Sequence, residues 1–406
     1  MKGGHHVAST ELIYNPLLPE FHANPYPFYR RLREEDPVHA SPLGIWVLTR
    51  YDDAVAVLRD ARFGREGIAE LAEARLGPGR TRPTNTRDML FRDPPDHTRL
   101  RALVSRAFTP RVVEAMRPHI QEIVDGLLDR VEDARGMDII EDLAYPLPVR
   151  VICEMMGVPT SDQEIFRRWS ADIARSLDAA LFPADSEVVT RGQAATDALR
   201  DYFRALIDVR RKDPRPDLLT GLIAAEEQGD KLSEAELLST CILLLIAGHE
   251  TTVNLIGNGL LALLQNPAQQ RLLADDPALI QTGVEELLRY DGPVQRTSRM
   301  AMADVEIGGK QIPKGSVVVA AIGAANRDPA CFADPERLDV TRKDNRHIAF
   351  GFGIHFCLGA PLARIEGQVA IGTLLRRMPA LKLCSDTPQW RESSVLRGLK
   401  TLPVTF

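Results

Sequence analysis

The sequence lacks several patterns that would assign it to a common class of protein. Its five cysteines are scattered without a C-x-x-C pair, which is not the spacing of a disulfide framework or a zinc module. The N-terminal segment has no apolar signal-peptide core, and no run reaches the roughly 18 apolar residues of a membrane span. With a net charge of −6, the chain also lacks the basic excess of a nucleic-acid binder. We therefore expect a cytoplasmic protein with no nucleic-acid and no membrane partner.

Polar linkers, low-complexity tracts and internal repeats are also missing from the 406 residues. A chain of this length often divides into two domains, but nothing in its composition marks a boundary. The 44% of hydrophobic residues suffices for one large core. We expect a single domain, residues 1–406, of a mainly α class with small β-sheet regions.

Hydrophobic periodicity places most of the chain in helices. Ser233 and Glu236 form a capping box, and no proline follows until Pro267, which predicts a helix of roughly thirty residues. Asp96 is expected to cap a helix that follows two prolines. Short strands are expected at 45–48 and 317–319, and a hairpin at 305–307 and 310–312. Other helices are expected at 27–35, 52–58, 112–133, 147–156, 162–177, 188–212, 277–290 and 360–377, with a short one at 68–76 inside the otherwise aperiodic stretch 63–96.

One cysteine, Cys357, lies in an informative stretch that runs from residue 350 to residue 359. Gly351 and Gly353 let the backbone turn tightly and approach something flat and large. Cys357 comes just before a predicted helix, whose free N–H groups favour an anionic sulfur. Apolar neighbours on both sides predict that it is buried. Such a thiolate suits haem iron, onto which it pushes electron density. The default for a lone cysteine, a small core residue, is kept for the other four: Cys153, Cys241, Cys331 and Cys384.

This stretch resembles the cysteine loop of the cytochrome P450 family at five positions: Phe350, Gly353, His355, Cys357 and Gly359. The likeness continues from Asn24-Pro25-Tyr26-Pro27 to Arg397-Gly398-Leu399. It implies the P450 fold and one haem b (iron protoporphyrin IX), with Cys357 as axial ligand of the iron and Phe350 and Gly351 against the cofactor. It also implies an oxidoreductase, a monooxygenase that inserts one oxygen atom of O2 into a hydrophobic small molecule by hydroxylation or epoxidation.

The long predicted helix carries a second motif between Ala247 and Thr252. There an apolar run changes abruptly to an acid and two hydroxyls. A threonine inside a helix can bond back to a preceding carbonyl and bend the helix, and a bend beside Gly248 would make room for a small ligand. In the P450 family the matching acid–threonine pair relays protons, so the resemblance implies catalytic roles for Glu250 and Thr251.

Two further sets of charged residues agree with the resemblance. Glu286 and Arg289 resemble the family's E-x-x-R, and Arg337 resembles the segment that supplies a second arginine, so the three are expected to form a buried structural network. The two carboxylates of a buried haem need cationic or hydrogen-bonding partners. The family places four such partners at His97, Arg101, Arg299 and His355.

The resemblance also predicts the wall of the substrate cavity. By family position, six residues are expected to line it: Leu90, Leu243, Ala247, Val294, Gln295 and Leu396. A mostly apolar wall with one amide suits a bulky hydrophobic molecule such as a macrolide, steroid, terpenoid or fatty acid. Segment 63–96 and the break at Phe182-Pro183 are expected at the entrance.

Electrons are expected from a separate ferredoxin or flavodoxin with its reductase. The chain has neither ferredoxin cysteine spacing nor a G-x-G-x-x-G motif after a strand. Arginines expected around the cysteine side would dock such an acidic partner: Arg99, Arg106, Arg111, Arg364, Arg376 and Arg377. Two alternatives stay open, a haem-thiolate peroxygenase or isomerase and a non-catalytic haem sensor. The pair Glu250–Thr251 favours the monooxygenase over both.

Overall fold

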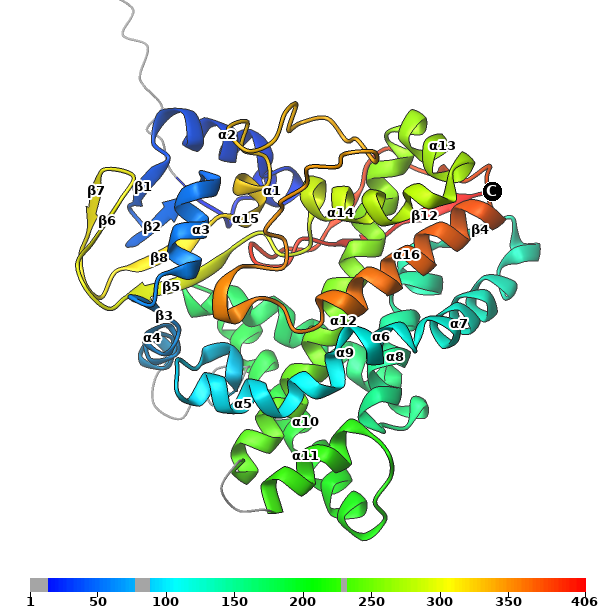
Figure 1. The fold of residues 1–406 in the computed structure, drawn as a ribbon, viewed down its shortest axis with the longest axis horizontal. Helices are drawn as coiled ribbons and strands as arrows, with labels where there is room; N and C mark the ends of the chain where they lie inside the picture. The colour runs from blue at the N-terminus through cyan, green and yellow to red at the C-terminus, as the bar shows by residue number, and fades with distance from the viewer. Residues whose placement is uncertain (1–13, 77–87, 228–231) are drawn as a thin grey trace, which may run out of the picture.

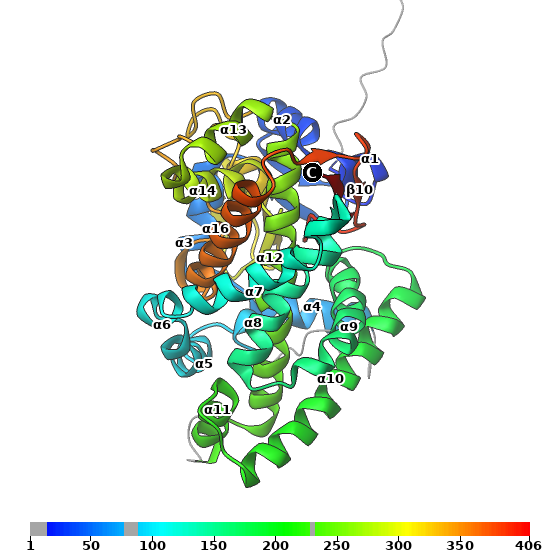
Figure 2. The same ribbon diagram turned by 90° about the vertical axis from the view of Figure 1, so that its right-hand side faces the viewer.

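A 31-residue helix, α12 (Glu234–Leu264), forms the centre of the molecule. The computed structural model describes residues 14–76, 88–227 and 232–406. The expected capping box starts α12: Ser233 Oγ accepts from the backbone N–H of Glu236, whose carboxylate accepts from the N–H of Ser233 at 2.8 Å. In Figures 1 and 2, α12 runs through the middle of the molecule, with other helices packed along it. By length and composition it could cross a membrane, but most of it is buried inside the protein as the core helix.

Helices from both halves of the sequence pack around α12. The main hydrophobic cluster runs from Met89 to Val404 and includes the apolar side of α12. The helices that contact α12 most closely are α8 (Pro146–Met156), α10 (Ser186–Lys212), α14 (Ile280–Asp291) and α16 (Ala360–Arg377). The remaining helices are α1 (Pro19–Ala23), α2 (Tyr26–Glu35), α3 (Tyr51–Arg59), α4 (Glu66–Leu76), α5 (Asp96–Ser105), α6 (Pro110–Glu114), α7 (Arg117–Asp129), α9 (Gln163–Ser176), α11 (Leu218–Glu227), α13 (Pro267–Asp275) and α15 (Ile322–Ala325).

A five-stranded sheet lies to one side of the helices, beside α1 to α3 (Figure 1). Its order is β1 (Val38–Ser41), β2 (Ile45–Leu48), β8 (Val317–Ala320), β5 (Thr297–Ala301) and β3 (Phe63–Gly64). Only β2 and β8 are parallel, with Ile45 opposite Val317. The expected hairpin is confirmed as β6 (Val305–Ile307) and β7 (Lys310–Ile312). Smaller pairings join β4 (Gly136–Asp138), β9 (Lys382–Leu383), β10 (Gln389–Trp390), β11 (Leu399–Thr401) and β12 (Pro403–Thr405).

The mainly α class with small sheets is confirmed, and three local predictions need correction. Asp96 does not cap α5: Pro95 is at the cap position, and the Asp96 carboxylate pairs with Arg99 at 3.0 Å. The helix expected at 112–133 is divided into α6 and α7, because Pro118 can only stand in a first turn. Helices α1, α11, α13 and α15 were not predicted, since each is short, and α11 packs on α10 and α12 rather than showing a strong period of its own.

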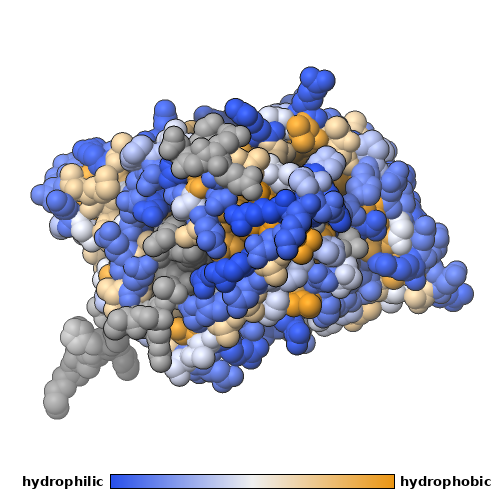
Figure 3. All heavy atoms as spheres, turned by 90° about the horizontal axis from the view of Figure 1, so that it is seen from below, coloured by the Kyte–Doolittle hydropathy of each residue, from blue (hydrophilic) through white to orange (hydrophobic). Residues whose placement is uncertain are grey.

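Figure 3 shows the molecule from below, the side on which α11 lies in Figure 1. Hydrophilic side chains dominate this face, and hydrophobic ones appear as small separate areas. The large apolar cluster of the helices lies in the interior and includes residues of α12.

Candidate active site

A largely apolar cavity of about 390 Å³ is bordered by α12 and by the loop that carries Cys357. The 3₁₀ helices η1 (Met89–Phe91) and η6 (Leu177–Ala180) contribute to its wall. Five of the six residues expected at the substrate line this cavity: Leu90, Leu243, Ala247, Val294 and Leu396.

Gln295 is not among the described residues that line the cavity, which corrects the sequence analysis. Its buried amide donates to the carbonyl of Gly292 at 2.9 Å and faces the hydroxyl of Tyr26. Successive side chains of an extended segment point to opposite sides. Val294 and Gln295 are adjacent, and of the two it is Val294 that lines the cavity. Arg296 lies on the same side as Val294 and lines the cavity in place of Gln295.

The cysteine loop is shaped by two glycines. Gly351 has φ 73° and Gly353 has φ 72°, a region that side chains with a Cβ disfavour. At Gly353 a Cβ would also lie 2.3 Å from the carbonyl oxygen of Leu58, so no other residue fits there. The backbone N–H of Cys357 donates to the carbonyl of Phe350 at 2.9 Å, which closes the loop.

Cys357 opens onto the cavity, whereas the sequence predicted a buried side chain. Its sulfur faces the cavity and not bulk water, and this low hydration raises the pKa of the thiol. The N–H groups of Gly359 and Ala360, at the start of α16, and the nearby Arg101 lower the pKa of this thiol in part. The predicted helix N-terminus is therefore present, but in the protein alone the effect of burial on the pKa of Cys357 is larger than the effect of these N–H groups.

Four cationic or hydrogen-bonding residues meet beside Cys357, as the resemblance implied. His97 and Arg101 come from α5, Arg299 from β5 and His355 from the cysteine loop, and all four line the cavity. The rings of His97 and His355 lie 4.3 Å apart, centre to centre. Arg65, which the sequence analysis did not identify, lines the same part of the cavity.

His97, Arg101, Arg299 and His355 lie close together, and Asp93 is the acid whose charge acts on two of them, His97 and Arg299. Burial, followed by Arg299 and the other cationic neighbours, lowers the pKa of His355 to about 2. Burial lowers the pKa of Arg299 to about 10. In the described part of the chain, Arg101 and Arg299 have no ion pair, and His355 Nε2 is buried without a hydrogen-bond partner. Such a donor set fits a bound group with two carboxylates, and the thiol beside it fits that group's iron.

The acid–threonine motif of α12 faces the same cavity. Thr251 Oγ1 donates back to the carbonyl of Ala247 at 3.2 Å, the predicted local bond. Gly248 has a further role: a Cβ there would lie 2.7 Å from Ile152 Cγ1, so this glycine lets α8 pack closely on α12. Glu250 and Thr251 both line the cavity.

Glu250 has a partner that no sequence motif indicated. Its Oε2 accepts from Nη1 of Arg391 at 2.9 Å, and His249 Nε2 lies 3.7 Å from Oε1. Burial alone raises the pKa of Glu250, but His249 and Arg391 outweigh it, and the pKa lies below its usual range. Arg391 follows β10 and lies 141 residues from Glu250 in the sequence, so no local pattern joins the two.

The E-x-x-R pair is buried as expected, but its second arginine is a different residue. Arg289 donates to Glu286 through Nε at 2.7 Å and Nη2 at 2.8 Å. Arg342 completes the network, with Nε 3.1 Å from Glu286 Oε2. Arg337 contributes only its backbone carbonyl to Arg289, and its side chain is 67% exposed beside Asp339. The assignment of Arg337 was therefore wrong, because the chain turns its side chain outward before Arg342 turns inward.

A second fully buried acid, Glu366 of α16, was not identified from the sequence. In the described structure neither of its oxygens has a clear hydrogen-bond or ion-pair partner. Burial raises the pKa of Glu366 to about 8, and the hydroxyl of Thr252 on α12 offsets a part of this. Because Thr252 itself lines the cavity, a carboxyl group whose pKa is raised to about 8 stands directly behind the acid–threonine motif.

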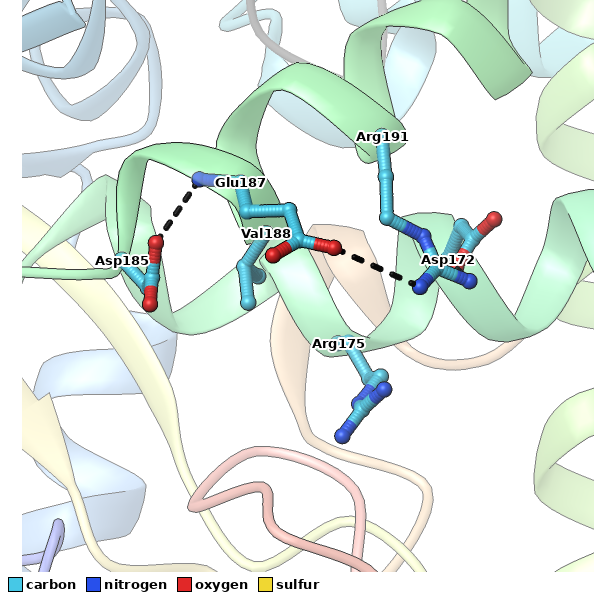
Figure 4. A pocket seen from close by; sticks show the side chains of 6 residues that line it. All are labelled: Asp172, Arg175, Asp185, Glu187, Val188 and Arg191. Carbon is cyan, nitrogen blue, oxygen red and sulfur yellow. Dashed lines mark hydrogen bonds and ion pairs between the residues drawn. The ribbon is translucent and has the colours of Figure 1, made fainter.

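A smaller depression of about 160 Å³ lies between α9 and the start of α10 (Figure 4). Its charged side chains largely pair with one another: Arg191 lies 2.9 Å from Asp172 and 3.9 Å from Glu187. Asp185 caps α10 by accepting from the N–H of Glu187 at 2.8 Å. These contacts stabilise the start of α10, and the depression shares no residue with the cavity at Cys357.

Comparison with known proteins gives one consistent result. The cytochrome P450 family model matches residues 37–276 and 277–400. The vitamin D(3) 25-hydroxylase of Pseudonocardia autotrophica is 45% identical, over 95% of this chain and 94% of that protein. The 6-deoxyerythronolide B hydroxylase of Saccharopolyspora erythraea is 44% identical, over 95% of this chain and 96% of that protein.

Among solved structures, P450BioI in complex with an acyl carrier protein that carries hexadec-9Z-enoic acid has a TM-score of 0.89. It is 43% identical and covers 95% of this chain and 99% of that chain. The cysteine loop, the acid–threonine motif and the E-x-x-R pair occupy one fold that these relatives share. With this cavity, these motifs and these relatives, the chain belongs to the cytochrome P450 family of haem-thiolate monooxygenases.

Proposed function

We propose that Cys357 binds the haem iron and that the adjoining apolar wall holds a bulky hydrophobic substrate for hydroxylation or epoxidation. The observation that carries this proposal is one cavity shared by three chemically different groups of residues. It brings together the thiol of Cys357, the two arginines Arg101 and Arg299, which have no ion pair among the described residues, and the apolar residues predicted at the substrate. As a P450, the protein is an oxidoreductase that uses haem and O2.

The chain's own residues would hold the cofactor and manage protons. When bound, haem supplies the oxidative chemistry of O2, which a thiolate ligand favours. Arg101, Arg299, His97 and His355 would bind its two carboxylates, while Phe350 and Gly351 would lie against it. Thr251 presents a hydroxyl to the cavity, from which it would donate a proton. The neighbouring carboxylate of Glu250, which Arg391 keeps charged, would accept a proton from outside the cavity and pass it on to the Thr251 hydroxyl.

The substrate is proposed by class only. Leu90, Leu243, Ala247, Val294 and Leu396 form an apolar wall that desolvates a hydrophobic molecule. Two relatives are named for hydroxylating vitamin D(3) and 6-deoxyerythronolide B, which are large and mostly apolar. A macrolide, steroid, terpenoid or fatty-acid derivative is accordingly the class to screen first.

Electrons would come from a separate ferredoxin or flavodoxin with its reductase. The protein would act in the cytoplasm as one domain, residues 1–406. Helix α6 packs against α16, the helix that begins just after Cys357. Among the described residues, exposed Arg106, Arg111 and Arg376 have no carboxylate partner, which suits the docking of an acidic protein. Three arginines of the expected patch are already paired with acids of this chain: Arg99, Arg364 and Arg377.

Ligation by Cys357 is the first test. Cys357→Ser should abolish the red-shifted Soret band of the reduced carbonyl complex, because a hydroxyl does not replace a thiolate on haem iron. Cys241→Ser is the matched control, since Cys241 is fully buried in α12 and does not line the cavity. A normal band in Cys357→Ser, or its loss in the control, would contradict the proposal.

The acid–threonine pair separates a monooxygenase from the two alternatives. Thr251→Ala should lower product formed per NADPH consumed by about tenfold or more, because proton delivery in the cavity is lost. The assay uses a generic ferredoxin and its reductase. Unchanged coupling would remove Thr251 from the mechanism, and faster native turnover with peroxide alone would favour a peroxygenase.

A further inference from the structure

Arg296 is a charged residue in the apolar wall of the cavity that the known chemistry does not use. Val294 pairs with Leu396 as an antiparallel bridge, and Gln295 N–H donates to the carbonyl of Val395 at 2.9 Å. The alternation of an extended segment therefore places Arg296 on the same side as Val294, toward the cavity. Arg296 is only 3% exposed, yet it lines the cavity together with Leu177, Leu181 and Val395.

The guanidinium of Arg296 is held rigidly by neighbours from two other segments. Its Nη2 donates to Asp178 Oδ1 at 2.6 Å, and its Nε donates to Ser394 Oγ at 2.8 Å. The ring of Phe182 lies under it, 4.9 Å from ring centre to Cζ. Asp178 is in turn fixed by the N–H of Ser394, which donates to Oδ2 at 2.8 Å. The direction of the remaining N–H groups is consequently set before any ligand binds.

Part of the hydrogen-bonding capacity of Arg296 is left over. A guanidinium has five N–H donors, of which the two acceptors above take one from Nε and one from Nη2. In the described part of the chain Nη1 of Arg296 has no acceptor. Nη1 is also not one of the fully buried polar atoms without a partner, so part of its surface is open to the cavity. The wall residues beside Arg296, Leu177, Leu181 and Val395, carry no side-chain acceptor, so a molecule bound in the cavity can supply one to Nη1.

We propose that Nη1 of Arg296 donates to a neutral carbonyl oxygen of the substrate, in a ketone, lactone or ester that is otherwise apolar. The inference rests on the proposed function, because it assumes that the apolar wall binds the substrate. Asp178 already balances the charge of Arg296 at 2.6 Å. A carboxylate would bring an unbalanced third charge into this buried site, at a high desolvation cost. A neutral carbonyl satisfies the free donor without that cost.

A matched pair of probes tests the inference on the haem-loaded protein. Cyclopentadecanone and cyclopentadecane are large, apolar rings that differ by one carbonyl oxygen. Isothermal titration calorimetry should show the ketone binding about tenfold or more tightly, the range of a hydrogen bond to a charged donor. Equal affinities, or no binding of the ketone, would overturn the inference. Pentadecanoate is the third probe, and tighter binding of this carboxylate than of the ketone would overturn the restriction to a neutral group.

A double variant removes the donor without leaving a buried charge. Arg296→Met alone would strand Asp178, so it is combined with Asp178→Asn. In this double variant the affinities for the ketone and the hydrocarbon ring should become about equal, and the affinity for the hydrocarbon ring should change by no more than about threefold. An undiminished preference would overturn the inference. Arg296→Lys is a second, independent test. An ammonium that pairs with Asp178 has no second donor nitrogen in a fixed direction, so the preference for the ketone should fall in this variant too.

The carbonyl-complex spectrum of each variant separates this inference from the proposed function. A normal red-shifted Soret band together with a lost ketone preference supports Arg296 as the residue that sets specificity. A normal band with an unchanged preference overturns the role of Arg296 and leaves ligation by Cys357 standing. Loss of the band in the wild-type protein would instead contradict the proposed function itself.

Discussion

Two glutamates that are equally buried, Glu286 and Glu366, lie in surroundings of opposite kind. Glu286 accepts from Arg289, Arg342 and Asn345 and from the backbone N–H of Asp339. Among the described residues, the hydroxyl of Thr252 is the one polar side-chain group that lowers the pKa of Glu366. A carboxylate surrounded by cations stays charged and joins chain segments, whereas one without them takes up a proton. The same residue type is thus a charged structural link in one region and a buried carboxyl with a raised pKa in the other.

The strongest test of this comparison is Glu286→Gln. It leaves Arg289 and Arg342 buried without an acid, and we expect the free energy of unfolding to fall by about 3–5 kcal/mol. Urea denaturation followed by circular dichroism at pH 7 measures the change. A loss below about 1 kcal/mol would mean that the network contributes little to stability.

The same substitution at Glu366 should raise the free energy of unfolding instead of lowering it. Its pKa of about 8 in the folded protein exceeds the ordinary value of 4.5, so the folded state holds a proton that the unfolded state releases. Stability is therefore lost as pH rises from about 4.5 to about 8. Glu366→Gln should match the wild type near pH 5 and exceed it by about 2–4 kcal/mol at pH 8. Parallel stability curves for the two proteins would show that Glu366 is charged after all.

Alanine substitutions of Arg342 and Arg337 should have smaller effects on stability, and the second substitution is the control for the first. Arg342→Ala removes a largely buried partner of Glu286 and should cost about 2 kcal/mol. Arg337→Ala removes an exposed side chain that pairs with Asp339 and should change stability by less than about 0.5 kcal/mol. Unfolding midpoints of the two variants decide between them. The reverse order would restore Arg337 to the network.

Features that depend on neighbouring residues could be predicted from the sequence. The capping box, residues 233–236, sets the start of α12. The turn before Cys357 needs glycine because Gly351 and Gly353 have positive φ angles. The cysteine loop and the acid–threonine motif are continuous, so their resemblance to a known family could be recognised without coordinates. His97, Arg101, Arg299 and His355 were found only through that resemblance, and the structure then brought them together at one cavity.

Features that join distant segments were decided by the tertiary structure. Arg391 reaches Glu250 across 141 residues, Arg296 reaches Asp178 across 118, and Arg342 reaches Glu286 across 56. Whether a side chain points inward depends on how its segment packs, which replaced Arg337 by Arg342 and Gln295 by Arg296. The sequence by itself determined that a thiol in a glycine-shaped loop and an acid–threonine pair on a long helix are present. Packing determined which charges are paired, because burial makes an unpaired charge costly and only the folded chain supplies its partner.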